Sequence, residues 1–102
     1  MKGRVIGGVG LLLSDGDNVM TAIAELSAGA SVSADNGAIE LIEPVSFGHK
    51  VALESIHRGG DIRKYGEVIA EATQDITTGE WVHTHNAESR RGRGDLSPGR
   101  DR

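Results

Sequence analysis

One short pattern, read as aliphatic-x-x-Gly-x-x-aliphatic, occurs at several places and restricts the fold of this chain more than any other feature. It is LSAGASV at 26–32, IHRGGDI at 56–62 and ITTGEWV at 76–82. A central glycine suits a tight turn that leads into a strand, because glycine adopts backbone angles that other residues avoid. The copies begin at residues 26, 56 and 76, so their spacing is irregular, which argues against a solenoid of fixed period. The pattern predicts a few similar corners in one small, folded-over β structure.

Short strands are expected between these glycines. Asn36-Gly37 is a strong hairpin signal, and it separates two of the strand candidates. The other candidates are bounded by Gly and Pro residues, as expected for a compact, mostly β domain. The predicted strands are 11–13, 30–33, 38–42, 49–53, 61–64, 68–71 and 81–85.

One segment has helical periodicity instead. Val19, Ala22, Ile23 and Leu26 fall at i, i+3, i+4 and i+7, which is one stripe of a helix. Asp17 or Asn18 could cap its start and Gly29 could end it. The spacing predicts a short amphipathic helix over 18–27.

The chain is large enough for a single small domain. Of its 102 residues, 37% are hydrophobic and only 3% aromatic, so the core must be thin and aliphatic. Such a domain is expected to bury apolar surface against a partner or against copies of itself as a homo-oligomer. We expect a glycine-rich lead at 1–10, the domain at 11–86, and a disordered Arg-rich tail at 87–102.

Charge and composition exclude several classes of function. Residues 1–86 carry six basic and twelve acidic side chains, so a nucleic-acid-binding surface is not expected. No apolar run is long enough for a membrane helix. The absence of cysteine excludes a disulfide framework, a thiol nucleophile and a thiolate metal site, and it fits a cytoplasmic protein.

The first residues, MKGRVIGGVGLLL, have some features of a signal peptide. Lys2 and Arg4 precede an apolar stretch, but Asp15 and Asp17 follow where a cleavage site of small residues should be. The alternative, a glycine-rich lead into a buried strand, fits the sequence better.

WVHTHN at 81–86 is the main candidate for chemistry. In a strand, Trp81, His83 and His85 would share one face, and the two histidines could hold one metal ion or one anionic substrate. A third ligand would have to come from elsewhere. The structural alternative is an exposed edge strand whose histidines discourage further pairing.

Two further groups of residues could take part. In FGHK at 47–50, His49 could transfer a proton and Lys50 could neutralise a carboxylate, or both could simply begin a polar strand. In KYGE at 64–67, Tyr65 could offer a proton or could be a packed side chain with a satisfied hydroxyl.

Together, GHKVAL, the run I-x-x-G-x-x-I-x-K-Y-G and the closing G-x-x-V-H-x-H-N resemble a known family. They are similar to the SAF domain of altronate and galactarate dehydratases, and to the small subunit of sulfolactate sulfo-lyase. DNVMTAIAEL at 17–26 resembles the family's opening segment. The resemblance implies a β-clip fold.

The resemblance also implies a reaction. It indicates a sugar-acid or hydroxy-acid substrate that loses water or sulfite with the help of a divalent metal (Fe²⁺, Mn²⁺ or Mg²⁺). A large catalytic subunit is the expected partner, and the isolated chain is expected to be inactive. The implied site residues are His49 and Tyr65 for proton transfer, Lys50 and Asn86 for substrate, and His83 and His85 for metal.

Three functions remain open at this point. The chain could be the small subunit of such a lyase, with either leaving group. It could be a stand-alone carbohydrate- or anion-binding module, or a purely structural oligomerisation domain.

Overall fold

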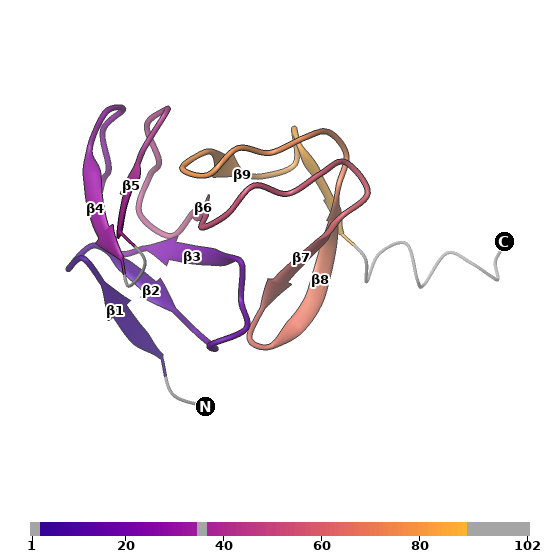
Figure 1. The fold of residues 1–102 in the computed structure, drawn as a ribbon, viewed down its shortest axis with the longest axis horizontal. Helices are drawn as coiled ribbons and strands as arrows, with labels where there is room; N and C mark the ends of the chain where they lie inside the picture. Colours follow the sequence, from indigo (N-terminus) through magenta and orange to yellow (C-terminus); the bar gives the residue numbers. More distant parts are fainter. Residues whose placement is uncertain (1–2, 35–36, 90–102) are drawn as a thin grey trace, which may run out of the picture.

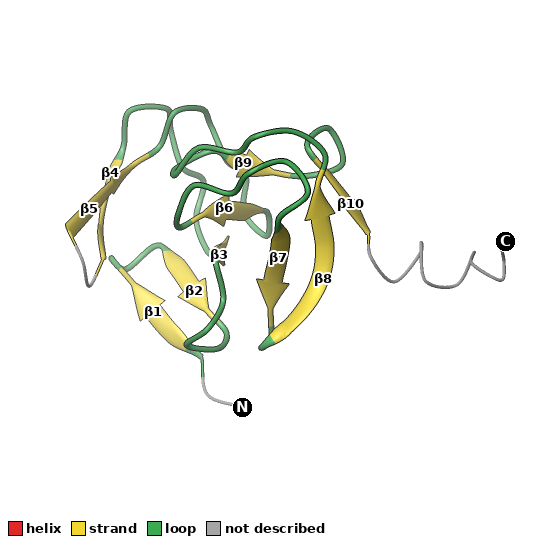
Figure 2. Ribbon diagram, turned by 45° about the vertical axis from the view of Figure 1, so that its right-hand side comes forward, coloured by secondary structure: helices red, strands yellow, loops and turns green. Residues whose placement is uncertain are grey.

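The computed structural model describes residues 3–34 and 37–89, and in these ranges it contains strands and loops but no helix (Figure 2). The prediction of a mostly β domain is confirmed. The strands are β1 (Arg4–Ile6), β2 (Gly10–Leu12), β3 (Val19–Ala22), β4 (Ser31–Ala34), β5 (Gly37–Glu40), β6 (Lys50–Ala52), β7 (Asp61–Lys64), β8 (Glu67–Ala72), β9 (Trp81–Val82) and β10 (Ala87–Ser89).

The strands form three antiparallel sheets. A five-stranded sheet has the order β1-β2-β3-β6-β9, a three-stranded sheet the order β10-β8-β7, and β4 pairs with β5 as a hairpin (Figure 1). The hairpin expected at Asn36-Gly37 is confirmed, because Ala34 pairs with Gly37 and Ser31 with Glu40. β7 and β8 form a second hairpin, which carries a bulge between Ile62 and Arg63.

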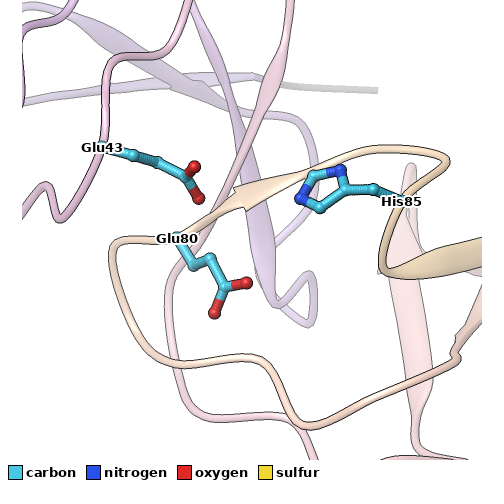
Figure 3. A group of neighbouring side chains, drawn as sticks. All are labelled: Glu43, Glu80 and His85. Carbon is cyan, nitrogen blue, oxygen red and sulfur yellow. The ribbon is translucent and has the colours of Figure 1, made fainter.

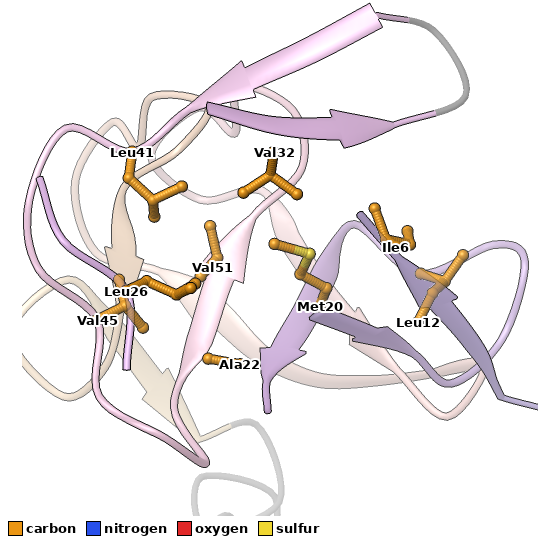
Figure 4. Packing of buried hydrophobic residues seen from close by; sticks show 9 residues of the cluster. All are labelled: Ile6, Leu12, Met20, Ala22, Leu26, Val32, Leu41, Val45 and Val51. Carbon is orange, nitrogen blue, oxygen red and sulfur yellow. The ribbon is translucent and has the colours of Figure 1, made fainter. Parts of the chain in front are cut away.

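Two apolar cores lie on opposite faces of the five-stranded sheet. Neighbouring residues of a strand point to opposite faces, and here both directions are buried. Met20 and Val51 belong to one core, which Figure 4 shows, whereas Val19 and Ala52 belong to the other. The central strands β3 and β6 are therefore anchored by packing on both sides.

The predicted helix over 18–27 is wrong for the same reason. Val19 and Met20 are adjacent and both almost fully buried, which two-sided burial in a central strand allows and a one-sided helical stripe does not. Ile23, which the stripe would bury, is 36% exposed. The apparent helical spacing combines two different elements. Val19 and Ala22 belong to β3, which ends at Ala22, whereas Leu26 packs into the first core from the corner that follows.

Four corners with the same sequence pattern connect the described strands, whereas the sequence analysis identified three copies of that pattern. The additional copy is VSFGHKV at 45–51. The corners associate in pairs through two-residue bridges, Leu26 with Val45 and Ile56 with Ile76. The corner glycines have positive φ values of 85° to 89°, a conformation that favours glycine. These glycines are Gly29, Gly48, Gly59 and Gly79.

The four corners also share one pattern of backbone hydrogen bonds. Each corner glycine donates its N–H to a carbonyl four residues before the partner corner begins: Gly29 to Leu41 at 2.7 Å, Gly48 to Ala22 at 2.8 Å, Gly59 to Ala72 at 2.8 Å and Gly79 to Ala52 at 2.9 Å. The folded-over β structure predicted from the glycines is thus built as two similar pairs of corners.

Both ends of the described chain differ from the expected boundaries. Arg4–Ile6, placed in the lead, pairs with β2 as β1. Ala87–Ser89, placed in the disordered tail, pairs with β8 as β10. The rest of the predicted tail, 90–102, lies outside the described residues.

Candidate functional site

A cleft of about 520 Å³ opens between the start of β6, the β7–β8 hairpin and the segment after β9. Three of the six predicted site residues line it: Lys50, Tyr65 and His83. Lys64, the first residue of the KYGE segment, was given no role from the sequence, and it joins them from the end of β7. The remaining lining residues are Glu67, Ile69, Ala70, Thr84, Ala87 and Ser89.

Two lysines and one carboxylate, that of Glu67, line the cleft, so its Lys and Glu side chains together carry a net positive charge. Burial of Lys50, together with the charge of nearby Lys64, lowers the pKa of the Lys50 ammonium group below its ordinary value. The Lys64 ammonium group lies 5.3 Å from the ring centre of Tyr65, a cation–π distance. An anionic group in the cleft would relieve the repulsion between the two cations.

Replacement of Lys50 by methionine tests the cost of burying this charge beside Lys64. Since the folded pKa lies below the unfolded one, the charged Lys50 costs stability at about pH 7, and wild-type stability rises relative to the variant as pH approaches about 10.4. We therefore expect Lys50→Met to raise the melting temperature at neutral pH, with a smaller gain at high pH. Thermal unfolding at both pH values measures this, and a lower melting temperature at neutral pH would contradict it.

Tyr65 is held in a backbone conformation that tyrosine rarely adopts. Its φ is +61°, and Tyr65 and Gly66 form the turn of the β7–β8 hairpin. The carboxylate of Asp17 accepts both of their N–H groups, at 2.9 Å from Tyr65 and 2.8 Å from Gly66. Strain of this kind is found at functional sites, and here it presents a 53% exposed tyrosine side chain beside the cleft.

The sequence suggested that Asp17 or Asn18 caps a helix, but both bind the β7–β8 hairpin instead. Asn18 is buried, and its amide accepts a hydrogen bond from the N–H of Arg63 at 2.8 Å and donates one to the carbonyl of Asp61 at 2.9 Å. The two residues fasten the β7–β8 hairpin to the main sheet, and so position Lys64 and Tyr65.

A group of aromatic rings lies at the edge of the cleft around Trp81. His83 stacks on Trp81 with ring centres 5.0 Å apart and an angle of 11°, and His85 lies 5.0 Å from the same ring. The indole N–H of Trp81 donates to Nδ1 of His49 at 3.0 Å. Because Nδ1 accepts this bond, the neutral His49 ring carries its proton on Nε2, which is the atom free to donate to a substrate.

The predicted strand over 81–85 ends early. β9 stops at Val82, and His83 begins a turn in which the N–H of Asn86 donates to the carbonyl of His83 at 3.1 Å. His83 and His85 therefore do not share one face of a strand, contrary to the prediction from the sequence. The structure places His83 in the cleft, and His85 beside Glu43 and Glu80.

Asn86 has no exposed surface. Its amide accepts from the N–H of His83 at 2.9 Å and donates to the carbonyl of Trp81 at 2.9 Å and to the carboxylate of Glu80 at 3.2 Å. The side chain predicted to contact substrate is thus buried and bonded to three groups of the chain itself, where it fixes the 83–86 turn and the side chain of Glu80.

Comparison with known proteins decides the family. The model of the altronate/galactarate dehydratase SAF domain matches residues 9–90. This chain belongs to that family. The resemblance seen in the sequence is therefore confirmed, and the SAF domain match includes every residue of the cleft.

The individual relatives include two dehydratases and one sulfo-lyase subunit. The chain is 44% identical over 73 residues to altronate dehydratase of Escherichia coli K12, a match that covers 72% of this chain and 15% of the relative. It is 41% identical over 68 residues to galactarate dehydratase (L-threo-forming) of the same organism, covering 67% and 13%. Against (2R)-sulfolactate sulfo-lyase subunit alpha of Paracoccus pantotrophus, it is 37% identical over 62 residues, covering 59% and 92%.

The SAF domain thus accounts for only about a seventh of the dehydratases it matches and for nearly all of a sulfo-lyase subunit. In the part of the chain that the structure describes, no helix has the length and apolar character needed to span a membrane.

Proposed function

We propose that this SAF domain is the small domain or subunit of a hydroxy-acid lyase, and that its cleft holds a carboxylate of the substrate beside a larger catalytic partner. The observation that carries the proposal is the convergence of Lys50 and Lys64 with Tyr65 and His83 in one cleft. The names of the relatives support a substrate of this class.

Altronate, galactarate and sulfolactate share one chemical arrangement, a 2-hydroxy carboxylate with a leaving group on the next carbon. Loss of the C2 proton and of hydroxide or sulfite from C3 gives an enol, which becomes a 2-keto acid by moving a proton from oxygen to carbon. Negative charge builds on the carboxylate side during proton loss, so fixed positive groups there lower the barrier.

The residues of this chain would divide that task. Lys50 and Lys64 would pair with the carboxylate, and Tyr65 and Nε2 of His49 would donate or accept protons. A divalent metal would add Lewis-acid stabilisation of the same charge. For such an ion, the oxygen and nitrogen donors of Glu43, Glu80 and His85 are a suitable set.

The test requires the chain together with its lyase partner, co-purified from its source. We expect turnover of a 2-hydroxy acid of this class, and a loss of about 100-fold or more in kcat/KM with Lys50→Met or Lys64→Met. Arg58→Met removes an exposed positive charge that does not line the cleft and serves as the matched control. Equal activity of all three variants would contradict the proposal.

The meeting of Lys50 and Lys64 in one cleft also favours a second function. A stand-alone anion-binding module would bind the same acids without a partner. Calorimetry of the isolated chain with altronate, galactarate and sulfolactate separates the two functions, since only the module binds with full affinity alone.

A further inference from the structure

A second group of polar side chains lies beside the cleft and is not needed for carboxylate binding. Glu43 comes from the loop between β5 and β6, whereas Glu80 and His85 come from the segments on either side of β9 (Figure 3). One ligand atom from each lies within 4.8 Å of the others. Two parts of the chain that are almost forty residues apart thus meet at this place.

The two carboxylates are held in place by donors from the fold. Glu43 accepts the N–H of Trp81 at 3.0 Å. Glu80 accepts the N–H of Thr77 at 2.9 Å with one oxygen and the amide of Asn86 at 3.2 Å with the other. A carboxylate has about four lone-pair positions, so these bonds orient the group and leave lone pairs for a further ligand.

The charge of this group favours a cation. Both carboxylates are half-buried, and among the described residues neither forms an ion pair with Lys or Arg. Two negative charges held close together in a partly buried place repel each other unless a cation lies between them.

The kind of cation follows from the donors. Imidazole nitrogen combined with carboxylate oxygen suits divalent transition ions such as Zn²⁺, Mn²⁺ and Fe²⁺, whereas Ca²⁺ and Mg²⁺ favour oxygen alone. Ligand atoms about 2.1 Å from one ion lie at most about 4.2 Å apart, so only a small rotation is needed, and His85 is exposed and can make it.

We propose that Glu43, Glu80 and His85 form a binding site for one divalent transition ion within this chain. Three protein ligands leave a position for water or for an oxygen of a bound acid. Trp81 contacts both His85 of this site and His83 of the cleft, so the ion and the cleft are neighbours.

Calorimetric titration of the full chain with Zn²⁺ tests the site directly. We expect one ion per chain and an affinity at least about 10-fold lower in His85→Ala and in Glu43→Gln. Both variants should fold, because His85 is exposed and the amide oxygen of a glutamine can still accept the N–H of Trp81. His57→Ala removes another exposed histidine, which is not one of the three ligands, and should bind as wild type.

Trp81 provides an independent signal, since it is the only tryptophan of the chain. Its ring lies 5.0 Å from that of His85, so an open-shell ion such as Ni²⁺ at the site should quench its fluorescence. We expect saturable quenching in wild type and His57→Ala and its loss in His85→Ala and Glu43→Gln. Unchanged Zn²⁺ affinity and quenching in the latter two variants would overturn the site. Neither measurement uses lyase activity, so failure here is distinct from failure of the proposed function.

Discussion

Alanine at position 79 is expected to destabilise the protein more than alanine at any other corner glycine. A Cβ atom at Gly79 would overlap the carbonyl oxygen of Glu40, whereas one at Gly59 would have no atom within 4 Å. Both positions have nearly the same positive φ, 89° and 86°. The conformational strain is therefore shared, and only Gly79→Ala adds a backbone clash.

The expected sizes differ accordingly. Gly59→Ala should cost about 1–2 kcal/mol of unfolding free energy from the left-handed conformation. Gly79→Ala should cost about 1–3 kcal/mol more, because the β5 end must move away from the corner. Denaturant unfolding of the two variants measures the difference, and equal losses would show that the Gly79 corner shifts without cost.

Removal of the Asn86 side chain should have the second-largest effect. Asn86→Ala leaves the N–H of His83 and the carbonyl of Trp81 without their partner, a side chain that has no exposed surface. Each such loss costs about 1–3 kcal/mol, so we expect a total of about 2–4 kcal/mol. Denaturant unfolding measures it, with the exposed His85→Ala in the same turn as a control that should change stability little.

The same variant should also disturb the ion site. Since Asn86 donates to Glu80, its loss frees a ligand to turn away. We expect Zn²⁺ affinity to fall by about 10- to 100-fold in the fraction that remains folded. Wild-type affinity in folded Asn86→Ala would mean that Thr77 alone orients Glu80.

Local chemistry was enough to predict much of the fold. Asn36-Gly37 marks a real hairpin, and the glycine pattern marks real corners, because a positive φ limits the residue that can occupy the position. The fourth corner, 45–51, has the same pattern and was within reach of the sequence. The region after Asp17 could not be read correctly, since periodicity alone does not distinguish a one-sided helix from a strand buried on both faces.

The site was predictable only in part. Lys50, Tyr65 and His83 do meet in one cleft. Lys64, Glu43 and Glu80 were missed because their positions depend on which corners pair and on how the β7–β8 hairpin attaches to the sheet. Asn86 was a natural candidate for an exposed contact, but its burial follows from the turn after Val82, which ends the expected strand.

The four equivalent corners share one backbone shape but carry different side chains. The two residues after the corner glycine are Ala30-Ser31, His49-Lys50, Gly60-Asp61 and Glu80-Trp81, so one backbone position accepts side chains of quite different chemistry. One corner of each pair carries the polar groups of the two candidate sites, and its partner carries small or simple side chains. New chemistry can therefore be introduced at the Ala30-Ser31 corner by changing two residues, while the glycine and its backbone bonds keep the shape. At the other plain corner Gly60 must stay glycine, because a Cβ atom there would lie 2.8 Å from the carbonyl oxygen of His57.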